Sequence, residues 1–197
     1  GGRHAAGMVD TGLLFELDCR RVLSMYSSKA FGAWYLQLAA ALVPMESRVL
    51  FSSVASGLGN VGQGNYAAGN SCLDAHALSR RAHGEVACSL QWPLVGGAGM
   101  GAEAYAALDK LQVTMTGLAG ISLAEYAACL GAHLTHSGGC TLSVQMVHDA
   151  DMRGLLDDLA DTSQPRFDEL VDRTKQASSS VALISTHAEG SALAQSL

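Results

Sequence analysis

SRVLFSSVASGLGNVGQGNYAAGN, residues Ser47–Asn70, joins a short apolar segment, a glycine-rich loop and the start of an alanine-rich segment. The apolar run Ser47–Val54, bounded by polar residues, predicts a buried strand. Asn65–His83 predicts a helix, because its last turn is basic and Gly84 follows as a stop signal. Val86–Trp92 then predicts a second buried strand. Strand, helix and strand with short connections are typical of a parallel sheet covered by helices, so the sequence predicts an α/β fold.

Further elements are expected on both sides of this unit. Apolar residues recur at helical spacing from Cys19 to Leu42, where Pro44 stops the run. A glycine-rich loop follows Pro93, and beyond it the pattern predicts a helix at Ala102–Val113, a helix at Ser122–His133 with Ser122 and Glu125 as a capping box, and a strand at Thr141–Val147.

The character of the chain changes after residue 150. Asp151–Asp161 is a charged helical segment, and Gln176–Leu197 is rich in serine and alanine with little periodicity. We therefore predict one folded domain over residues 1–150, followed by a helix and linker over residues 151–197.

Composition excludes several classes of function. The formal charge is −6 and no basic stripe is present, so nucleic acid is not an expected partner. No uncharged run has the build of a membrane span, and no membrane association is expected. The five cysteines lie far apart without a C-x-x-C pair, which predicts neither a disulfide framework nor a zinc ribbon and favours an intracellular, cytoplasmic location. His133 and His136 lack a third ligand nearby in sequence, so no metal site is predicted.

GLGNVG, Gly57–Gly62, matches the G-x-G-x-x-G dinucleotide fingerprint by its letters. The fingerprint requires its first glycine at the end of a strand and an acidic residue at the end of the next strand. Here Ser52–Ser56 separate the strand from Gly57, and Val86–Trp92 ends without a carboxylate. We therefore interpret GLGNVG as a loop that leads from the strand to the helix and not as a phosphate cradle.

Polar side chains gather around this loop. Ser53 ends the strand, and Tyr66 and Asn70 are four residues apart on the next helix, hence on one face. A phenol, a hydroxyl and an amide facing one cleft could bind and protonate a carbonyl oxygen, once a cation lowers the pKa of the tyrosine. Lys29, in the first helix, is the candidate cation. Each residue alone also has an ordinary structural explanation, as a buried tyrosine, a turn serine, a polar helix residue or a surface lysine.

Taken together, these residues resemble the catalytic core of the short-chain dehydrogenase/reductases, and in particular the ketoreductase domains of modular polyketide synthases. In those domains asparagine follows the tyrosine by four residues and the lysine lies on the preceding long helix. The surrounding text is similar too: HAAGMVDTGLL (4–14), KAFGAWYL (29–36), FSSVAS (51–56) and GQGNYAAGNSCLDAHA (62–77).

The resemblance implies a Rossmann-like parallel sheet with flanking helices that lacks the N-terminal cofactor-binding strands, since the similar text begins at the HAAG strand. It also implies NADPH-dependent reduction of a β-ketoacyl thioester carried on an acyl carrier protein, within a synthase whose neighbouring domains are further partners. Tyr66 would donate the proton, Ser53 would hold the carbonyl oxygen, Lys29 would lower the tyrosine pKa and touch the nicotinamide ribose, and Asn70 would position a relay water.

The same resemblance implies the surroundings of the reacting groups. The cofactor side would comprise Ala6, Gly7, Lys29, Tyr66, Trp92 and Pro93. The substrate side would comprise Leu58, Gln63 and Met100. Both stereochemical markers of the family are replaced, by Val9-Asp10-Thr11 and by Leu58, so the sequence assigns no hydroxyl configuration.

Two other interpretations remain open. The chain could be a non-catalytic structural or scaffolding module derived from a ketoreductase, or a ketoacyl reductase of the fatty-acid type. The complete set of Lys29, Ser53, Tyr66 and Asn70 favours an enzyme over a scaffold, because a decayed domain has no chemical reason to retain all four.

Overall fold

The computed structural model describes residues 1–43, 45, 47–59, 62–99, 101–102, 120–135, 144–146 and 163. The elements are β1 (Gly2–His4), η1 (Leu14–Glu16), α1 (Cys19–Tyr26), η2 (Ser27–Phe31), α2 (Gly32–Ala39), β2 (Arg48–Ser53), α3 (Ala55–Leu58), α4 (Gly64–Ala82), β3 (Cys88–Trp92), α6 (Leu123–Thr135) and β4 (Val144–Met146). All of them lie in one compact unit of residues 1–113 and 120–148.

A second unit comprises residues 114–119 and 149–197. Of this unit only Ser163 is described. The helix expected at Ala102–Val113 and the boundary expected at residue 150 therefore fall almost wholly outside the described residues and stay predictions.

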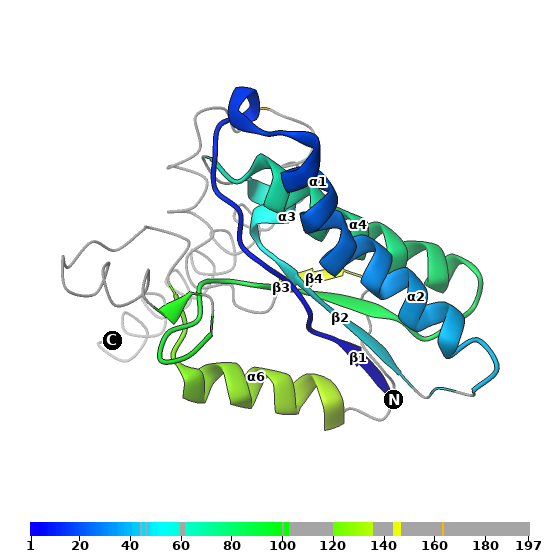
Figure 1. Ribbon diagram of the computed structural model, residues 1–197. Coiled ribbons are helices and arrows are strands. Elements are labelled where there is room, and N and C mark those ends of the chain that lie inside the picture. The colour runs from blue at the N-terminus through cyan, green and yellow to red at the C-terminus, as the bar shows by residue number, and fades with distance from the viewer. Residues whose placement is uncertain are drawn as a thin grey trace, which may run out of the picture. The chain divides into compact units, whose positions relative to one another are not determined.

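The sheet has four parallel strands in the order β1-β2-β3-β4. Helices α1, α2 and α4 cover one face, and α6 lies on the other (Figure 1). The predicted parallel α/β sheet with flanking helices is thus confirmed, and the predicted strands at 47–54 and 86–92 are β2 and β3, shorter by one or two residues at their ends.

The two faces of the sheet differ in character. Val49, Cys88, Leu90 and Trp92 form an apolar core with Ile121, and Tyr126, Cys129 and Leu130 of α6 pack against it. On the opposite face Leu50 packs against Ala33, Leu73 and Ala77. Beyond Leu50, that face carries the polar residues Ser52, Ser89 and Gln91, which hydrogen-bond to α4 or to the turn before it. The sheet is therefore apolar toward α6 and partly polar toward α4.

The long helix predicted at Cys19–Leu42 is interrupted and ends earlier. Residues Ser27–Phe31 form a π-helical turn between α1 and α2, and α2 ends at Ala39. Lys29 lies in this wide turn and is buried. A π-turn inserts one extra residue into a helix and frequently occurs at functional sites.

The predicted helix ends are confirmed in two places. Ser122 and Glu125 form the reciprocal capping box before α6. After α4, Gly84 adopts φ +80, and the amides of Gly84 and Glu85 bond the carbonyls of Arg81 and Arg80. These bonds satisfy carbonyls that the helix end would otherwise leave free.

The cysteines qualify one expectation. Cys19, Cys72 and Cys129 are free, whereas Cys88 at the start of β3 is disulfide-bonded. Spacing along the chain does not predict such a bond, because it depends on which residues the fold brings together. Within the described ranges, no helix has the length and apolar character needed to cross a bilayer.

Two glycine substitutions should change stability in opposite directions. Among the described residues, an added Cβ would meet nothing within 4 Å at Gly84, where φ is +80, or at Gly131 inside α6. Gly84→Ala should lower the free energy of unfolding by about 1 kcal/mol, since alanine disfavours positive φ. Gly131→Ala should raise it by about 0.5–1 kcal/mol, since alanine is the better helix former. Urea unfolding of both variants measures the difference, and equal effects would contradict the assigned backbone conformations.

Candidate functional site

The site lies at the carboxyl edge of the sheet, where parallel strands usually place their ligands. Ser53 ends β2 and is paired with Trp92, which ends β3. The segment after β1 reaches the same edge, and the amide of Gly12 donates to the carbonyl of Gly62 over 2.8 Å. Three segments distant in sequence therefore meet here.

Lys29 is a buried cation at this edge. Its side chain enters from η2, it is 3% exposed, and Nζ donates to the carbonyl of Phe51 over 3.2 Å. Gly7 makes room for it, because a Cβ there would stand 2.8 Å from Nζ. Burial lowers the pKa of Lys29 from 10.5 to about 8, and the negative charge of Asp74 opposes this shift. The amine is thus poised to exchange its proton much nearer to neutrality than an ordinary lysine.

Tyr66 and Asn70 lie on α4 beside this amine. The Nζ atom of Lys29 is 5.6 Å from the centroid of the Tyr66 ring. Asn70 is fully buried and donates from Nδ2 to the carbonyl of Tyr66 over 3.0 Å. Among the described residues its Oδ1 has no partner, so it can accept a hydrogen bond from a bound molecule. The structure thus places Lys29 beside the Tyr66 ring and Asn70 one helical turn after Tyr66 on α4.

Ser53 is partly exposed at the end of β2, and its Oγ accepts from the amide of Ala55 over 3.2 Å. Its hydroxyl hydrogen remains available for a ligand at the sheet edge. Ser53 follows Phe51, the residue whose carbonyl accepts from Lys29, by two positions. Strand β2 therefore carries Ser53 and also accepts the hydrogen bond from Lys29.

The described residues of the GLGNVG segment, 57–59 and 62, are not arranged as in a phosphate cradle. Gly57 lies inside α3, a helix that the sequence did not predict, instead of at a strand end. Gly59 and Gly62 adopt φ +80 and φ +70, conformations that suit glycine and turn the chain toward α4. Of the expected substrate-side residues, Leu58 ends α3 and Gln63 precedes α4, while Met100 lies outside the described residues.

The expected cofactor-side residues are placed differently from one another. Ala6 is exposed and Gly7 adjoins Lys29. Trp92 is buried in the core, where its ring is stacked on Phe51 and lies 4.5 Å from Tyr126 by centroids. The following Pro93 is buried as well. Among the residues the structure describes, no three metal-ligating side chains come together.

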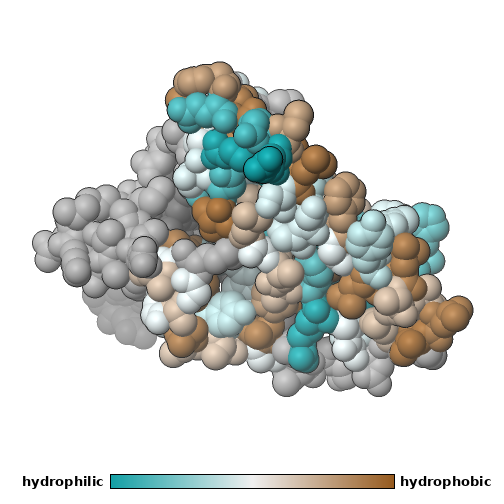
Figure 2. Space-filling view, in the orientation of Figure 1, coloured by the Kyte–Doolittle hydropathy of each residue, from teal (hydrophilic) through white to brown (hydrophobic). Residues whose placement is uncertain are grey.

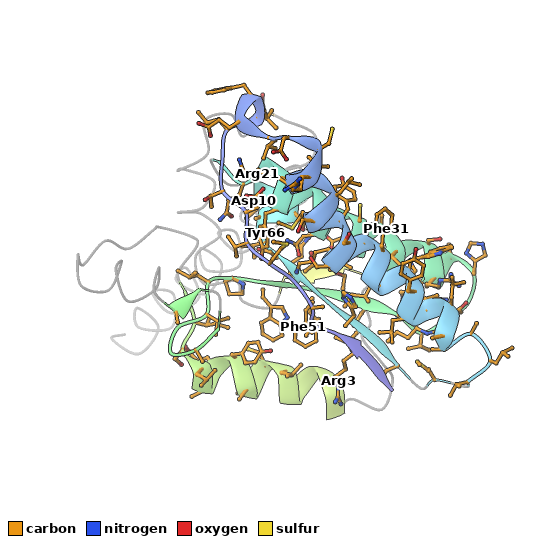
Figure 3. All side chains as sticks on the ribbon, in the orientation of Figure 1. Arg3, Asp10, Arg21, Phe31, Phe51 and Tyr66 are labelled. Carbon is orange, nitrogen blue, oxygen red and sulfur yellow. The ribbon has the colours of Figure 1, made fainter. Side chains whose placement is uncertain are left out.

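A polar clamp that the sequence analysis missed holds the segment after β1. Asp10 accepts from Arg21 Nε and Nη2 over 3.1 and 2.5 Å, and from Asn65 Nδ2 over 3.0 Å. These hydrogen bonds lower the pKa of Asp10, and those from Arg21 have the largest effect. Asp10, Arg21 and Tyr66 lie at the same end of the molecule, whereas Phe51 lies between the sheet and α6 (Figure 3). The clamp fixes the residue that immediately precedes Tyr66.

Replacing Lys29 by methionine should increase the stability of the fold near neutral pH. At neutral pH the wild-type fold carries a cation that it disfavours, since burial lowers its pKa from 10.5 to about 8. Lys29→Met should therefore be more stable near neutrality, by up to about 3 kcal/mol at 1.36 kcal/mol per pKa unit. The advantage should be full below pH 8 and shrink toward pH 10.5, because there the unfolded wild type binds more protons than the native state and its stability rises with pH.

Thermal or urea unfolding of both proteins across this pH range measures the effect. A methionine variant that is less stable near neutrality, or an advantage that grows with pH, would contradict the picture of a disfavoured buried cation.

Comparison with known proteins agrees with this geometry. Residues 1–97 match the family described as KR domain. The chain is 42% identical over 132 residues to polyketide synthase GfsA of Streptomyces halstedii, covering 67% of this chain and 2% of that protein. It is 42% identical over 133 residues to the spectinabilin polyketide synthase system protein NorB of Streptomyces orinoci, covering 66% of this chain and 6% of that protein.

Solved structures show the same relationship. PlmKR1, the ketoreductase from the first module of phoslactomycin biosynthesis in Streptomyces sp. HK803, is similar with a TM-score of 0.68 and 30% sequence identity. The match covers 85% of this chain and 37% of that one. The chain thus spans a small part of the synthases it resembles and about a third of the solved domain.

Proposed function

The chain belongs to the KR domain family of modular polyketide synthases, and we propose that it serves NADPH-dependent reduction of a β-ketoacyl thioester to the β-hydroxyacyl thioester. The observation that carries the proposal is the buried amine of Lys29 beside the ring of Tyr66, at a sheet edge that also holds Ser53 and Asn70. A buried cation next to a phenol is an arrangement for proton transfer.

In this proposal Tyr66 donates its phenolic proton to the β-keto oxygen, while Ser53 Oγ donates a hydrogen bond to the same oxygen. Ser53 Oγ already accepts from the amide of Ala55, and this bond helps to orient the hydroxyl. Negative charge that develops on the substrate oxygen is thereby neutralised at the moment it forms.

Lys29 and Asn70 serve the tyrosine. The cation of Lys29 favours the phenolate that remains after proton donation, since opposite charges stabilise each other in a poorly solvated site. Asn70 Nδ2 is held by the Tyr66 carbonyl, which leaves Oδ1 directed to a relay water that returns a proton to the phenolate. After each turnover Tyr66 is neutral again.

NADPH supplies a hydride to the β-carbon when it is bound. The residues present fit its nicotinamide ribose: Lys29 carries three N–H donors, and within the described part of the chain the Phe51 carbonyl accepts a hydrogen bond from one of them. The remaining donors can bind ribose hydroxyls. Gly7 and Ala6 at the end of β1, with Pro93 and the backbone of Trp92 after β3, are the proposed contacts around this end of the cofactor.

The proposed substrate side comprises Leu58, Gln63 and Met100.

The proposed partners are an acyl carrier protein and neighbouring synthase domains. Hydrophobic side chains gather over the end of α2 (Figure 2), where Leu38, Leu42 and Val43 are more than half exposed. Exposed apolar groups of this kind suit contact with another domain. The alternative proposal, a non-catalytic scaffolding module, would use the same surface. An activity assay therefore has to separate the reductase from the scaffolding module.

The full-length protein that carries this sequence should oxidise NADPH when given a small β-keto thioester. Tyr66→Phe keeps the ring beside Lys29 and removes the proton donor, so it should lower kcat by about 10²–10⁴-fold with little change in NADPH binding. Absorbance of NADPH and a binding titration measure both quantities. A folded wild-type protein that binds NADPH without turnover would leave the scaffolding proposal.

Gly7→Ala should impair the reaction through Lys29. The new Cβ would stand 2.7 Å from Cε and 2.8 Å from Nζ of Lys29, so the amine has to leave its position. We expect about a tenfold or greater loss of kcat/KM, since misplaced catalytic groups lose most of their effect. Gly57→Ala is the matched control, because its Cβ would make only ordinary contacts of 3.6 Å with Gln91. Equal activity of the two variants would contradict a role for the Lys29 position.

A further inference from the structure

Asp74 of α4 is a buried carboxylate with three side-chain donors. Its side chain accepts from Ser89 Oγ at 2.6 Å, from Ser56 Oγ at 2.6 Å and from Gln91 Nε2 at 2.9 Å. The residue is 9% exposed. The sequence analysis assigned it no role, and neither does the proposed reaction.

These contacts join three elements. Ser89 and Gln91 belong to β3. Ser56 belongs to α3 and follows Ser53 by three positions. Asp74 belongs to α4 and lies about two helical turns after Tyr66. On the other face of the same strands, the described core is an apolar cluster around Leu90 and Trp92. A buried charge is not needed to close a sheet against a helix, and apolar residues of similar size often do it with equal or greater stability. The polar closure at this place therefore calls for a role other than packing.

The hydrogen bonds around Asp74 extend to the backbone of Ser53 and Asn70. Ser56 Oγ also lies 2.8 Å from the carbonyl of Ser53, so its one hydrogen is shared between that oxygen and Asp74. Ser52 Oγ donates to the carbonyl of Asn70 over 3.4 Å and lies 3.4 Å from Ser56 Oγ. The strand end that carries Ser53 and the helix that carries Tyr66 and Asn70 are held together through these contacts.

The negative charge of Asp74 also raises the pKa of Lys29. Burial lowers the pKa of Lys29, and the charge of Asp74 is the opposing influence. The other titratable groups near the amine are Tyr66 of α4, whose ring lies 5.6 Å from Nζ, and His4 of β1. The pKa of His4 is lowered by burial and by Lys29 itself. Because an imidazole is either neutral or positively charged, His4 cannot supply the negative charge that Asp74 supplies.

We infer that Asp74 is a positioning residue for the proposed reduction: its carboxylate, through Ser56 and the strand β3, fixes the Ser53 strand end against the Tyr66 helix and places a negative charge near the buried amine of Lys29. The inference rests on the proposed function for its chemistry. Its electrostatic part, the coupling of Asp74 to Lys29, is a property of the folded chain and can be measured without turnover.

Asp74→Asn separates charge from shape. An asparagine has the same size, and the hydroxyls of Ser56 and Ser89 can rotate to accept from its amide, so most of the network can persist. Two variants control for the change. Asp18→Asn removes one carboxylate from the exposed N-cap of α1, where asparagine caps equally well. Ser89→Ala removes one hydrogen bond to Asp74 and no charge.

The first readout is the pH profile of kcat and KM for NADPH oxidation by the full-length protein. For Asp74→Asn we expect the high-pH limb of kcat to move by about 0.5–1 pH unit toward lower pH, a three- to tenfold loss above the limb, with a smaller change in KM. Asp18→Asn should leave the limb in place, and Ser89→Ala should weaken stability without moving it. A limb at the wild-type position in Asp74→Asn would overturn the inference.

The second readout is the titration of Lys29 itself by NMR of ε-carbon-labelled lysine in the 197-residue chain. The sequence has three lysines, Lys29, Lys110 and Lys175, and Lys29→Arg identifies the signal by its loss. Asp74→Asn should lower the midpoint of that signal, and Asp18→Asn should not. An unchanged midpoint overturns the inference even if the wild type reduces no thioester, whereas a lowered midpoint in an inactive protein sinks the proposed function and leaves the Asp74–Lys29 coupling.

Discussion

The burial of one lysine amine organises this structure. Lys29 is 3% exposed and bonds a strand carbonyl, although an amine of this kind strongly prefers water. Two features allow it to reach that position: the π-turn in the first long helix and the missing side chain of Gly7, where a Cβ would stand 2.8 Å from Nζ. A second glycine, Gly69 of α4, lets the helix approach Met25 of α1, since a Cβ there would stand 3.1 Å from Met25 Cγ.

The two faces of the sheet divide stability and chemistry between them. The face toward α6 is closed by stacked aromatic and aliphatic side chains, with Trp92 between Phe51 and Tyr126. The face toward α4 combines a small apolar cluster with the hydrogen-bonded set around Asp74. An apolar core tolerates small shifts, whereas a satisfied buried polar network fixes its members in one arrangement. Precise placement of Ser53 relative to Tyr66 therefore depends on the polar half.

Local features could be predicted from the sequence because their causes are local. The basic last turn of α4, the glycine at φ +80 after it, and the capping box of α6 follow from residues within four positions of each other. The helical spacing of Tyr66 and Asn70 likewise placed them on one face. The early end of α2 and the helix α3 were not predicted, because tertiary packing at Lys29 and at the sheet edge overrides the weak propensities of those segments.

What the sequence determined by itself was the order of strands and helices and the residue types at the sheet edge, since periodicity and end signals are written in neighbouring residues. Tertiary structure alone decided that Lys29 is buried, that Asp74 gathers donors from two elements, and that Asp10 meets Asn65 across 55 positions. These depend on desolvation and on contacts between distant segments. A burial that shifts a pKa exists only once the chain has closed around the group.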